Sequence, residues 1–171
     1  MSEHEPQQKR LGLGMVIAAW VIVLFLATSG FDTLLQKQHN PNLYLQHDGA
    51  GGERKVALKR NRAGHYLARG EINRQAVVFI LDTGATDVSI PAHLAQRLGL
   101  QRGVETVYQT ANGPITAFRT QLDEVALGPI RLRNVAASIN PSIDEEEILL
   151  GMSFLKHLEF HQQGNTLTLQ Q

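Results

Sequence analysis

The sequence predicts a mainly β domain, folded as a closed or nearly closed barrel with one or two short helices and preceded by one transmembrane helix. Three observations support this fold class. Uncharged residues run without a break from Leu11 to Phe31, and short stretches rich in β-branched or aromatic residues recur from Glu53 onward. Only two segments of that later part have helical character.

The N-terminal apolar run has the length of a membrane span. Its 21 residues, Leu11 to Phe31, cross the hydrocarbon core of a bilayer at helical rise. Lys9 and Arg10 precede the run and the segment after it is nearly neutral, so the positive-inside tendency keeps the N-terminus in the cytoplasm and exports the rest. A signal peptide cleaved near Ala27–Ser29 and a buried core helix are the alternatives. The length of the run favours an anchor.

One exported domain is expected behind this helix. The expected parts are a cytoplasmic N-terminus at 1–10, a transmembrane helix at 11–31, a flexible linker at 32–52 and a folded domain at 53–171. The linker is rich in Gln, His and Asn, contains a turn at Asn40-Pro41 and ends in the Gly-rich segment Asp48–Gly52. We therefore expect a single-pass protein of the cytoplasmic (inner) membrane with an exported domain, which is periplasmic if the source is a Gram-negative bacterium.

Composition excludes several classes of function. The 16 Lys and Arg residues balance the 16 Asp and Glu residues, so no basic excess is present for a nucleic-acid partner. Cysteine is absent, which excludes disulfides, thiolate metal sites and Cys nucleophiles but does not decide the compartment. No cofactor is expected.

Candidate strands account for most of the region after Glu53. They are Lys55 to Lys59, His65 to Ile72, Gln75 to Leu81, Val104 to Thr110, Ile115 to Leu122, Glu124 to Leu127, Arg131 to Ile139 and Thr166 to Leu169. Tight turns at Ile72–Gln75 and Ala111–Pro114 are expected to make hairpins. Two helices are expected, Pro91 to Leu98 with Gly99 as its stop, and Ser153 to His157 with Ser153 as its cap.

An apolar stretch leads directly into an acidic residue at Asp82. The strand Gln75 to Leu81 is followed at once by Asp82-Thr83-Gly84, and a carboxylate at the end of a buried strand loses hydration. It therefore needs hydrogen-bonding partners or a function that uses the carboxylate. A turn carboxylate that caps nearby N–H groups is the structural alternative. A phosphatase nucleophile is disfavoured, because Gly84 stands where such a motif has its second Asp.

Three segments together resemble a known family. Leu81–Thr86 resembles the active-site signature of retropepsin-like aspartic proteases, which is an apolar strand, Asp-Thr/Ser-Gly, a small residue and a polar one. Ile148–Leu155 is similar to the second signature of that family, and Tyr108–Ile115 is similar to its flap hairpin. The resemblance covers about residues 54–171. With the anchor, the chain looks like a bacterial membrane-anchored, single-domain group that is similar to retroviral proteases.

This resemblance implies a fold, an activity and a set of site residues. The implied fold is the closed acid-protease barrel, and the implied activity is that of an aspartic endopeptidase acting on polypeptides. The chain has one Asp-Thr-Gly, so the resemblance implies a homodimer in which Asp82 of two copies forms the catalytic pair. The implied catalytic residues are Asp82, Thr83 and Gly84, and the implied substrate-binding residues are Thr86, Asp87, Asn112 and Gly113.

The chain departs from the retroviral pattern in the flap and in the second signature. Pro114 removes one backbone donor from the flap, and Met152 stands where retroviral enzymes often carry Arg. The alternative function is a catalytically silent retropepsin-like domain that binds peptides or promotes assembly, because a fold alone does not decide activity.

Two clusters of polar residues are interpreted without a metal. His157 and His161 have helical spacing, but no third ligand is convincing. The acidic run Asp144–Glu147 lacks the pattern of a calcium loop and is interpreted as a solvated loop before a core strand. No metal site is therefore expected.

Overall fold

The computed structural model describes residues 5–45, 54–110 and 113–171. The chain divides into two compact units, residues 1–38 and 39–171. The first contains nearly all of helix α1 (Glu5–His39), and the second contains all the strands.

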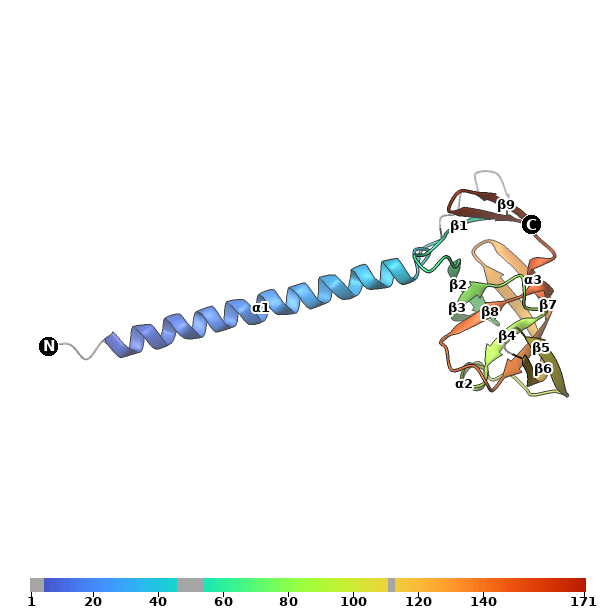
Figure 1. The fold of residues 1–171 in the computed structure, drawn as a ribbon, viewed down its shortest axis with the longest axis horizontal. Helices are drawn as coiled ribbons and strands as arrows, with labels where there is room; N and C mark the ends of the chain where they lie inside the picture. Colours follow the sequence, from blue (N-terminus) through green and yellow to red (C-terminus); the bar gives the residue numbers. More distant parts are fainter. Residues whose placement is uncertain (1–4, 46–53, 111–112) are drawn as a thin grey trace. The chain divides into compact units, whose positions relative to one another are not determined.

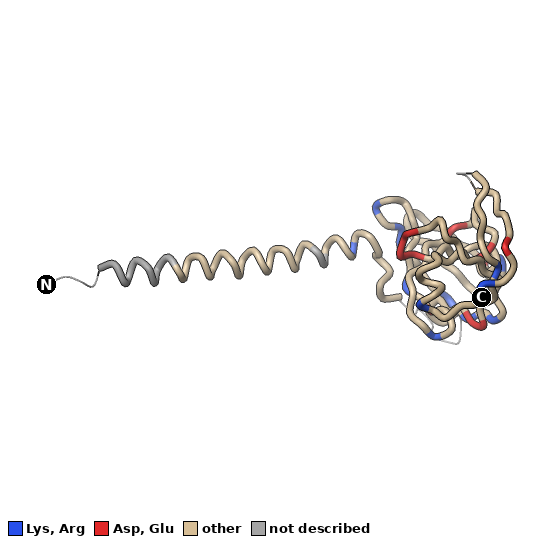
Figure 2. The backbone as a smooth tube through the Cα atoms, turned by 90° about the horizontal axis from the view of Figure 1, so that it is seen from below, with Lys and Arg blue, Asp and Glu red and all other residues tan. Residues whose placement is uncertain are grey.

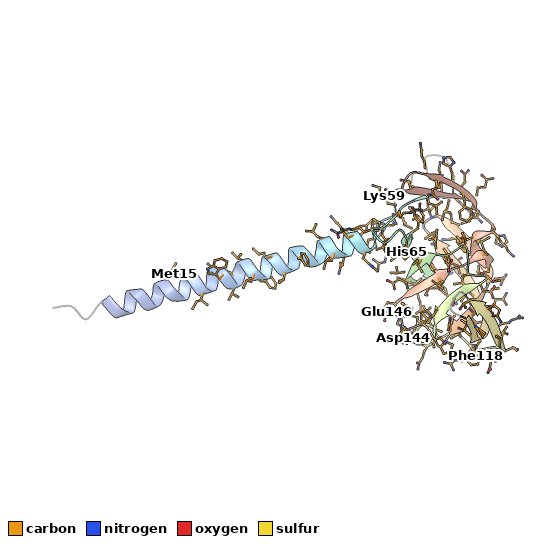
Figure 3. The ribbon with its side chains drawn as sticks, viewed as in Figure 1. Met15, Lys59, His65, Phe118, Asp144 and Glu146 are labelled. Atoms are coloured by element: carbon orange, nitrogen blue, oxygen red, sulfur yellow. The ribbon has the colours of Figure 1, made fainter. Side chains whose placement is uncertain are left out.

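Helix α1 is long and apolar enough to cross a membrane. Its span Gly14–His39 has a mean hydropathy of 2.2 over the most apolar window, and none of that window is buried. The apolar side chains of α1, Met15 among them, project outward around the helix (Figure 3). The helix continues past the predicted end at Phe31 through His39, because no Gly or Pro interrupts this segment and Pro41 follows it.

The second unit is mainly β, as predicted. Its strands are β1 (Lys55–Lys59), β2 (Leu67–Ile72), β3 (Gln75–Leu81), β4 (Val88–Pro91), β5 (Glu105–Thr110), β6 (Gly113–Leu127), β7 (Ile130–Asn140), β8 (Glu147–Leu150), β9 (Glu159–Gln163) and β10 (Thr166–Gln170). The helices α2 (Ala92–Arg97) and α3 (Met152–Leu155) are short.

Six strands close into a barrel. They follow the order β2-β3-β8-β4-β7-β6, and β6 pairs back with β2 through Glu71 with Ala126 and Ile72 with Val125. Strand β5 pairs with β6 outside this closed ring (Figure 1). The predicted closed barrel with one or two short helices is confirmed.

The chain ends form a separate three-stranded sheet in the order β1-β10-β9. Strands β1 and β10 alternate in burial, so that Val56, Leu58 and Leu169 are fully buried in the core. Strand β9 is exposed along its whole length and lies at the edge of this sheet.

Strand β3 leads directly into Asp82. Val77 and Phe79 are buried, and Phe79 is among the largest fully buried side chains. Side chains alternate across a strand, so Ile80 points away from the core. Leu81 packs against the core, and Asp82 follows it directly, outside the strand.

The turn between β2 and β3 confirms the predicted hairpin. Asn73 and Arg74 both have positive φ, 48° and 66°, as the tight type I′ hairpin turn requires. The Asn73 side chain also accepts a hydrogen bond from the Glu124 backbone at 3.0 Å. This bond ties the turn to β6.

Several boundaries differ from the prediction. The two strands expected on either side of Asp123 are one strand, because the register of β6 against β7 stays the same on both sides of it. Strand β4 was not predicted, since four residues after a turn give too short a pattern. Pro91 precedes α2 as its N-cap residue instead of opening its first turn, and Gly151, not Ser153, is the N-cap residue of α3.

The second unit begins earlier than the predicted boundary at residue 53. Asn42 is buried, with 4% of its surface exposed. Its carboxamide donates to the carbonyls of Lys59 and Leu67, at 2.9 and 2.6 Å, and accepts from the Lys59 N–H at 2.7 Å. Part of the predicted linker is therefore packed against β1 and the start of β2.

Replacing Asn42 with Ala is expected to destabilise this unit by about 2–3 kcal/mol, because three hydrogen bonds are lost and their backbone partners stay unpaired. Chemical denaturation of the full-length chain in detergent measures the change. The exposed Asn165, replaced with Ala, is the matched control. Equal stability of the two variants would contradict the assignment of Asn42 to the folded unit.

Candidate active site

The segment after β3 folds back as a turn that presents the Asp82 carboxylate. The Asp82 N–H donates to the Leu150 carbonyl of β8 at 3.2 Å, and the Ala85 N–H donates to the Asp82 carbonyl at 3.3 Å. The Gly84 N–H donates to Oδ1 of Asp82 at 2.8 Å. The first two bonds fix the backbone of Asp82, and the Gly84 N–H sets the orientation of its carboxylate, which stays partly exposed.

Helix α3 packs against the loop Asp82–Asp87, which is named the catalytic loop because it contains the predicted catalytic residues. The first N–H groups of a helix have no partner within it, and here the Met152 and Ser153 N–H groups donate to the carbonyls of Ala85 and Thr86, at 2.8 and 2.9 Å. Gly151 makes this approach possible, because a Cβ at this position would collide with the carbonyl oxygens of Asp87 and Ala85.

Ser153 fastens the end of the catalytic loop to the barrel. Its hydroxyl accepts from the Val88 N–H at 3.1 Å and donates to the Ala136 carbonyl of β7 at 2.7 Å. The sequence prediction that Ser153 caps its own helix is wrong, since no side chain caps α3. The hydroxyl instead joins β4 to β7, a contact between segments far apart in the sequence.

A cavity of about 350 Å³ opens beside Asp82. Its lining comes from the catalytic loop, β4, β5, β6, β7 and β8, and consists of Asp82, Gly84, Ala85, Thr86, Asp87, Ser89, Tyr108, Gln109, Thr110, Ile115, Ser138, Asn140 and Leu149. The barrel therefore gathers polar and apolar groups from six segments around the Asp82 carboxylate, and Asp87 is a second acidic residue of this lining.

Four of the predicted site residues line this cavity, namely Asp82, Gly84, Thr86 and Asp87. Thr83 is exposed in the catalytic loop and does not line the cavity. Gly113 begins β6 with a φ of 105° and pairs with Thr110, also outside the lining. Asn112 lies outside the described residues.

Tyr108 reaches the catalytic loop from β5. Its hydroxyl donates to Oδ2 of Asp87 at 3.1 Å. Burial, and then the Asp87 carboxylate, raise the pKa of Tyr108 above its usual value of 10.0, while Arg119 opposes this effect. The phenol therefore stays protonated, and remains a hydrogen-bond donor, across the acidic and neutral range.

Sequence reasoning did not find all the residues of the cavity wall. Tyr108 pairs with Ile115 in the β5–β6 hairpin. Its place in the predicted flap hairpin was the available sequence signal that it lies near the site. Ser89, Ser138 and Asn140 come from β4 and β7, which pair in parallel. No local pattern marks them, because the closure of the barrel brings them to the site.

Charges are distributed over the second unit without a large region of one sign (Figure 2). In the predicted acidic loop, Glu146 lies 3.3 Å from His93 and 3.8 Å from Arg97, while Glu147 begins β8 and bonds His39 at 2.9 Å. Asp144 and Glu146 lie together near the surface of this unit (Figure 3). These are mainly exposed pairs, which contribute little to stability.

The described residues contain no group of three His, Cys, Asp or Glu side chains that could hold a metal ion. His157 and His161 do not share a helix, because α3 ends at Leu155 and His161 lies in β9. Their helical spacing in the sequence therefore has no counterpart in the structure.

Comparison with known proteins agrees with this geometry. Residues 68–157 match the model of the family described as "gag-polyprotein putative aspartyl protease". The chain belongs to the retropepsin-like aspartic protease family. The matched region includes both the catalytic loop and Gly151, so the resemblance seen in the sequence is confirmed.

A crystal structure of a retropepsin-like aspartic protease from Rickettsia conorii is similar to this chain, with 28% identity and a TM-score of 0.60 over 73% of this chain and 96% of that one. An uncharacterized Sinorhizobium protein, from the region 5′ of cobV, is 29% identical over 90% of this chain and 71% of its own length. An uncharacterized Rickettsia prowazekii protein is 28% identical over 61% of this chain and 46% of its own length.

Proposed function

We propose that this retropepsin-like chain is an endopeptidase that hydrolyses peptide bonds with two Asp82 carboxylates, one from each of two copies. The observation that carries the proposal is the position of Asp82 in an intact Asp-Thr-Gly, beside a cavity of about 350 Å³ and with Oδ1 held by the Gly84 N–H at 2.8 Å. A turn carboxylate serving only the fold has no need of that cavity.

The chemistry requires two carboxylates at hydrogen-bond distance. Two like charges so close do not both ionise, so the pair shares one proton. One carboxylate takes a proton from the attacking water, whose oxygen bonds to the peptide carbon, and the other protonates the carbonyl oxygen. The C–N bond then breaks as the amide nitrogen receives a proton. Because the chain has one Asp-Thr-Gly, a symmetric homodimer supplies the pair.

The substrate is an extended polypeptide segment. Strand β5 pairs with β6 on one side, and an extended chain can add to a strand edge by main-chain hydrogen bonds. Thr86 and Asp87, which line the cavity, are expected to contact this chain, and Asn112 and Gly113 of the flap are its other proposed contacts. The Thr83 hydroxyl, exposed in the catalytic loop, bonds across the dimer axis.

Incubation of the purified full-length chain with an unfolded protein, from acidic to neutral pH, tests the activity. Mass spectrometry of the products is expected to show internal cleavage that pepstatin-like inhibitors block. If the wild type is dimeric and inert under all these conditions, the peptide-binding or assembly function replaces the enzymatic one.

Helix α1 is proposed as a retained anchor in the cytoplasmic membrane, with the protease domain exported. The unburied apolar span Gly14–His39 and the preceding Lys9 and Arg10 support this topology. Intact mass measurement of the chain purified from membranes is expected to include α1, and protease added to spheroplasts is expected to digest the domain. A chain that has lost the residues up to about Ser29, or a protected domain, would contradict the proposal.

A further inference from the structure

One side-chain hydrogen bond joins the β5–β6 hairpin to the catalytic loop. Tyr108 lies on β5, and Asp87 lies five residues after Asp82 on the loop before β4. The hydroxyl of Tyr108 donates to Oδ2 of Asp87 at 3.1 Å, and both residues line the cavity beside Asp82. The bond thus closes one side of that cavity.

The two partners of this bond are held differently by the rest of the fold. The main chain around Asp87 is fixed, because its carbonyl packs on Gly151 and the next N–H, of Val88, bonds to Ser153. The hairpin extends beyond the barrel. The ladder of β6 with β7 starts at Phe118, whereas residues 113–117 of β6 pair with β5. A tether from the fixed loop therefore limits the motion of the hairpin.

The chemistry of the pair suits such a tether. A hydrogen bond from a neutral hydroxyl to a carboxylate is stronger than one between neutral groups, and at 3.1 Å this one is at the long end of the range for a hydroxyl donor. Tyr108 is partly buried, so water competes less for the bond. With Oδ2 bonded to Tyr108, the carboxylate of Asp87 has one favoured orientation, and its other oxygen has a defined direction.

We propose that Tyr108 is a positioning residue of this site, which orients the Asp87 carboxylate and holds the β5–β6 hairpin against the loop that carries Asp82. The cavity is thereby formed before substrate binds, and binding does not have to order the hairpin. The consequence for catalysis rests on the proposed function, whereas the consequence for the hairpin does not.

Hydrogen exchange of the full-length chain in detergent tests the tether without using activity. Replacing Tyr108 with Phe removes only the hydroxyl, and the amides of residues 105–110 and 115–118 are expected to exchange about tenfold faster, as loss of one charge-assisted hydrogen bond allows. The amides of β1 and β10 serve as an internal reference. The matched control is Tyr44→Phe, because Tyr44 is 88% exposed. Unchanged exchange in the Tyr108→Phe hairpin would overturn the proposal.

Steady-state kinetics of the same variants test the effect on the site. Tyr108→Phe is expected to raise KM about tenfold and to change kcat less than twofold, because substrate binding must then order the hairpin while Asp82 is untouched. In an Asp87→Ala background the same substitution is expected to have no further effect, because the two residues act as one unit. An active wild type with equal KM in Tyr108→Phe, or additive effects in the double variant, would overturn the proposal. An inactive wild type would defeat the proposed function, and hydrogen exchange would still decide whether the tether exists.

Discussion

Replacing Asp82 with Asn is expected to lower peptide-bond hydrolysis by roughly 10²–10⁴-fold, the usual contribution of one general acid or base. The amide has nearly the shape of the carboxylate, and its oxygen still accepts the bond that the Gly84 N–H makes to Asp82 at 2.8 Å. It cannot take a proton from water, so the shared proton of the pair is lost. The ratio of kcat/KM for wild type and variant, measured on one unfolded protein substrate, gives the effect.

A second Asp→Asn variant separates this chemical effect from loss of one negative charge. Asp123 is exposed on β6 and does not line the cavity beside Asp82, so Asp123→Asn is expected to keep wild-type activity. Equal melting temperatures of the three proteins would show that the folds match. Retention of activity in Asp82→Asn would assign the observed hydrolysis to another group or to a contaminant.

Replacing Gly151 with Ala is expected to produce the largest loss of stability, about 3 kcal/mol, at the upper end of the range for overpacking. A methyl group here meets the carbonyl oxygens of Asp87 and Ala85 and the carbonyl carbon of Asp87. These are backbone atoms, which cannot rotate away as a long side chain can. To make room, α3 must move from the catalytic loop and break the Met152 bond to Ala85.

Urea denaturation of the full-length chain in detergent measures this loss, and activity is expected to fall with it because the loop carries Asp82. Gly30→Ala is the matched control, since nothing lies within 4 Å of the added methyl in helix α1 and Ala favours a helix. If Gly151→Ala unfolds at the wild-type urea concentration, the close packing between α3 and the loop does not exist as described.

The parts of the fold that could be predicted are those with a local cause. Alternating burial along β3, with Val77 and Phe79 inward, follows from its apolar pattern. The turn at Asn73-Arg74 was predictable from Asn73, which tolerates positive φ, whereas the positive φ of Arg74 has no such local cause. Asp82 stands at the end of β3, where the run of apolar residues stops, so its place in the fold was also visible in the sequence.

The missed parts depend on contacts between distant segments. Ser153 has the sequence position of a helix cap, yet its partners are Val88 and the carbonyl of Ala136 on β7. Asn42 lies in a polar segment that resembles a linker, and its role as both donor and acceptor appears only when β1 and β2 bring their backbone groups to it. Tyr108 is likewise recognised as a site residue only because the catalytic loop places Asp87 beside it.

The most direct test of the shared catalytic pair is a mixing measurement at constant total protein. Wild-type and Asp82→Asn full-length chains are exchanged to equilibrium in detergent, and hydrolysis is measured as the fraction of wild-type chain changes. If each active site needs Asp82 from both copies, an equal mixture is expected to retain about one quarter of the wild-type rate, because random pairing leaves that share of dimers with two intact carboxylates. Retention of one half, in proportion to the wild-type chain, would mean that each chain works alone and would contradict the shared pair.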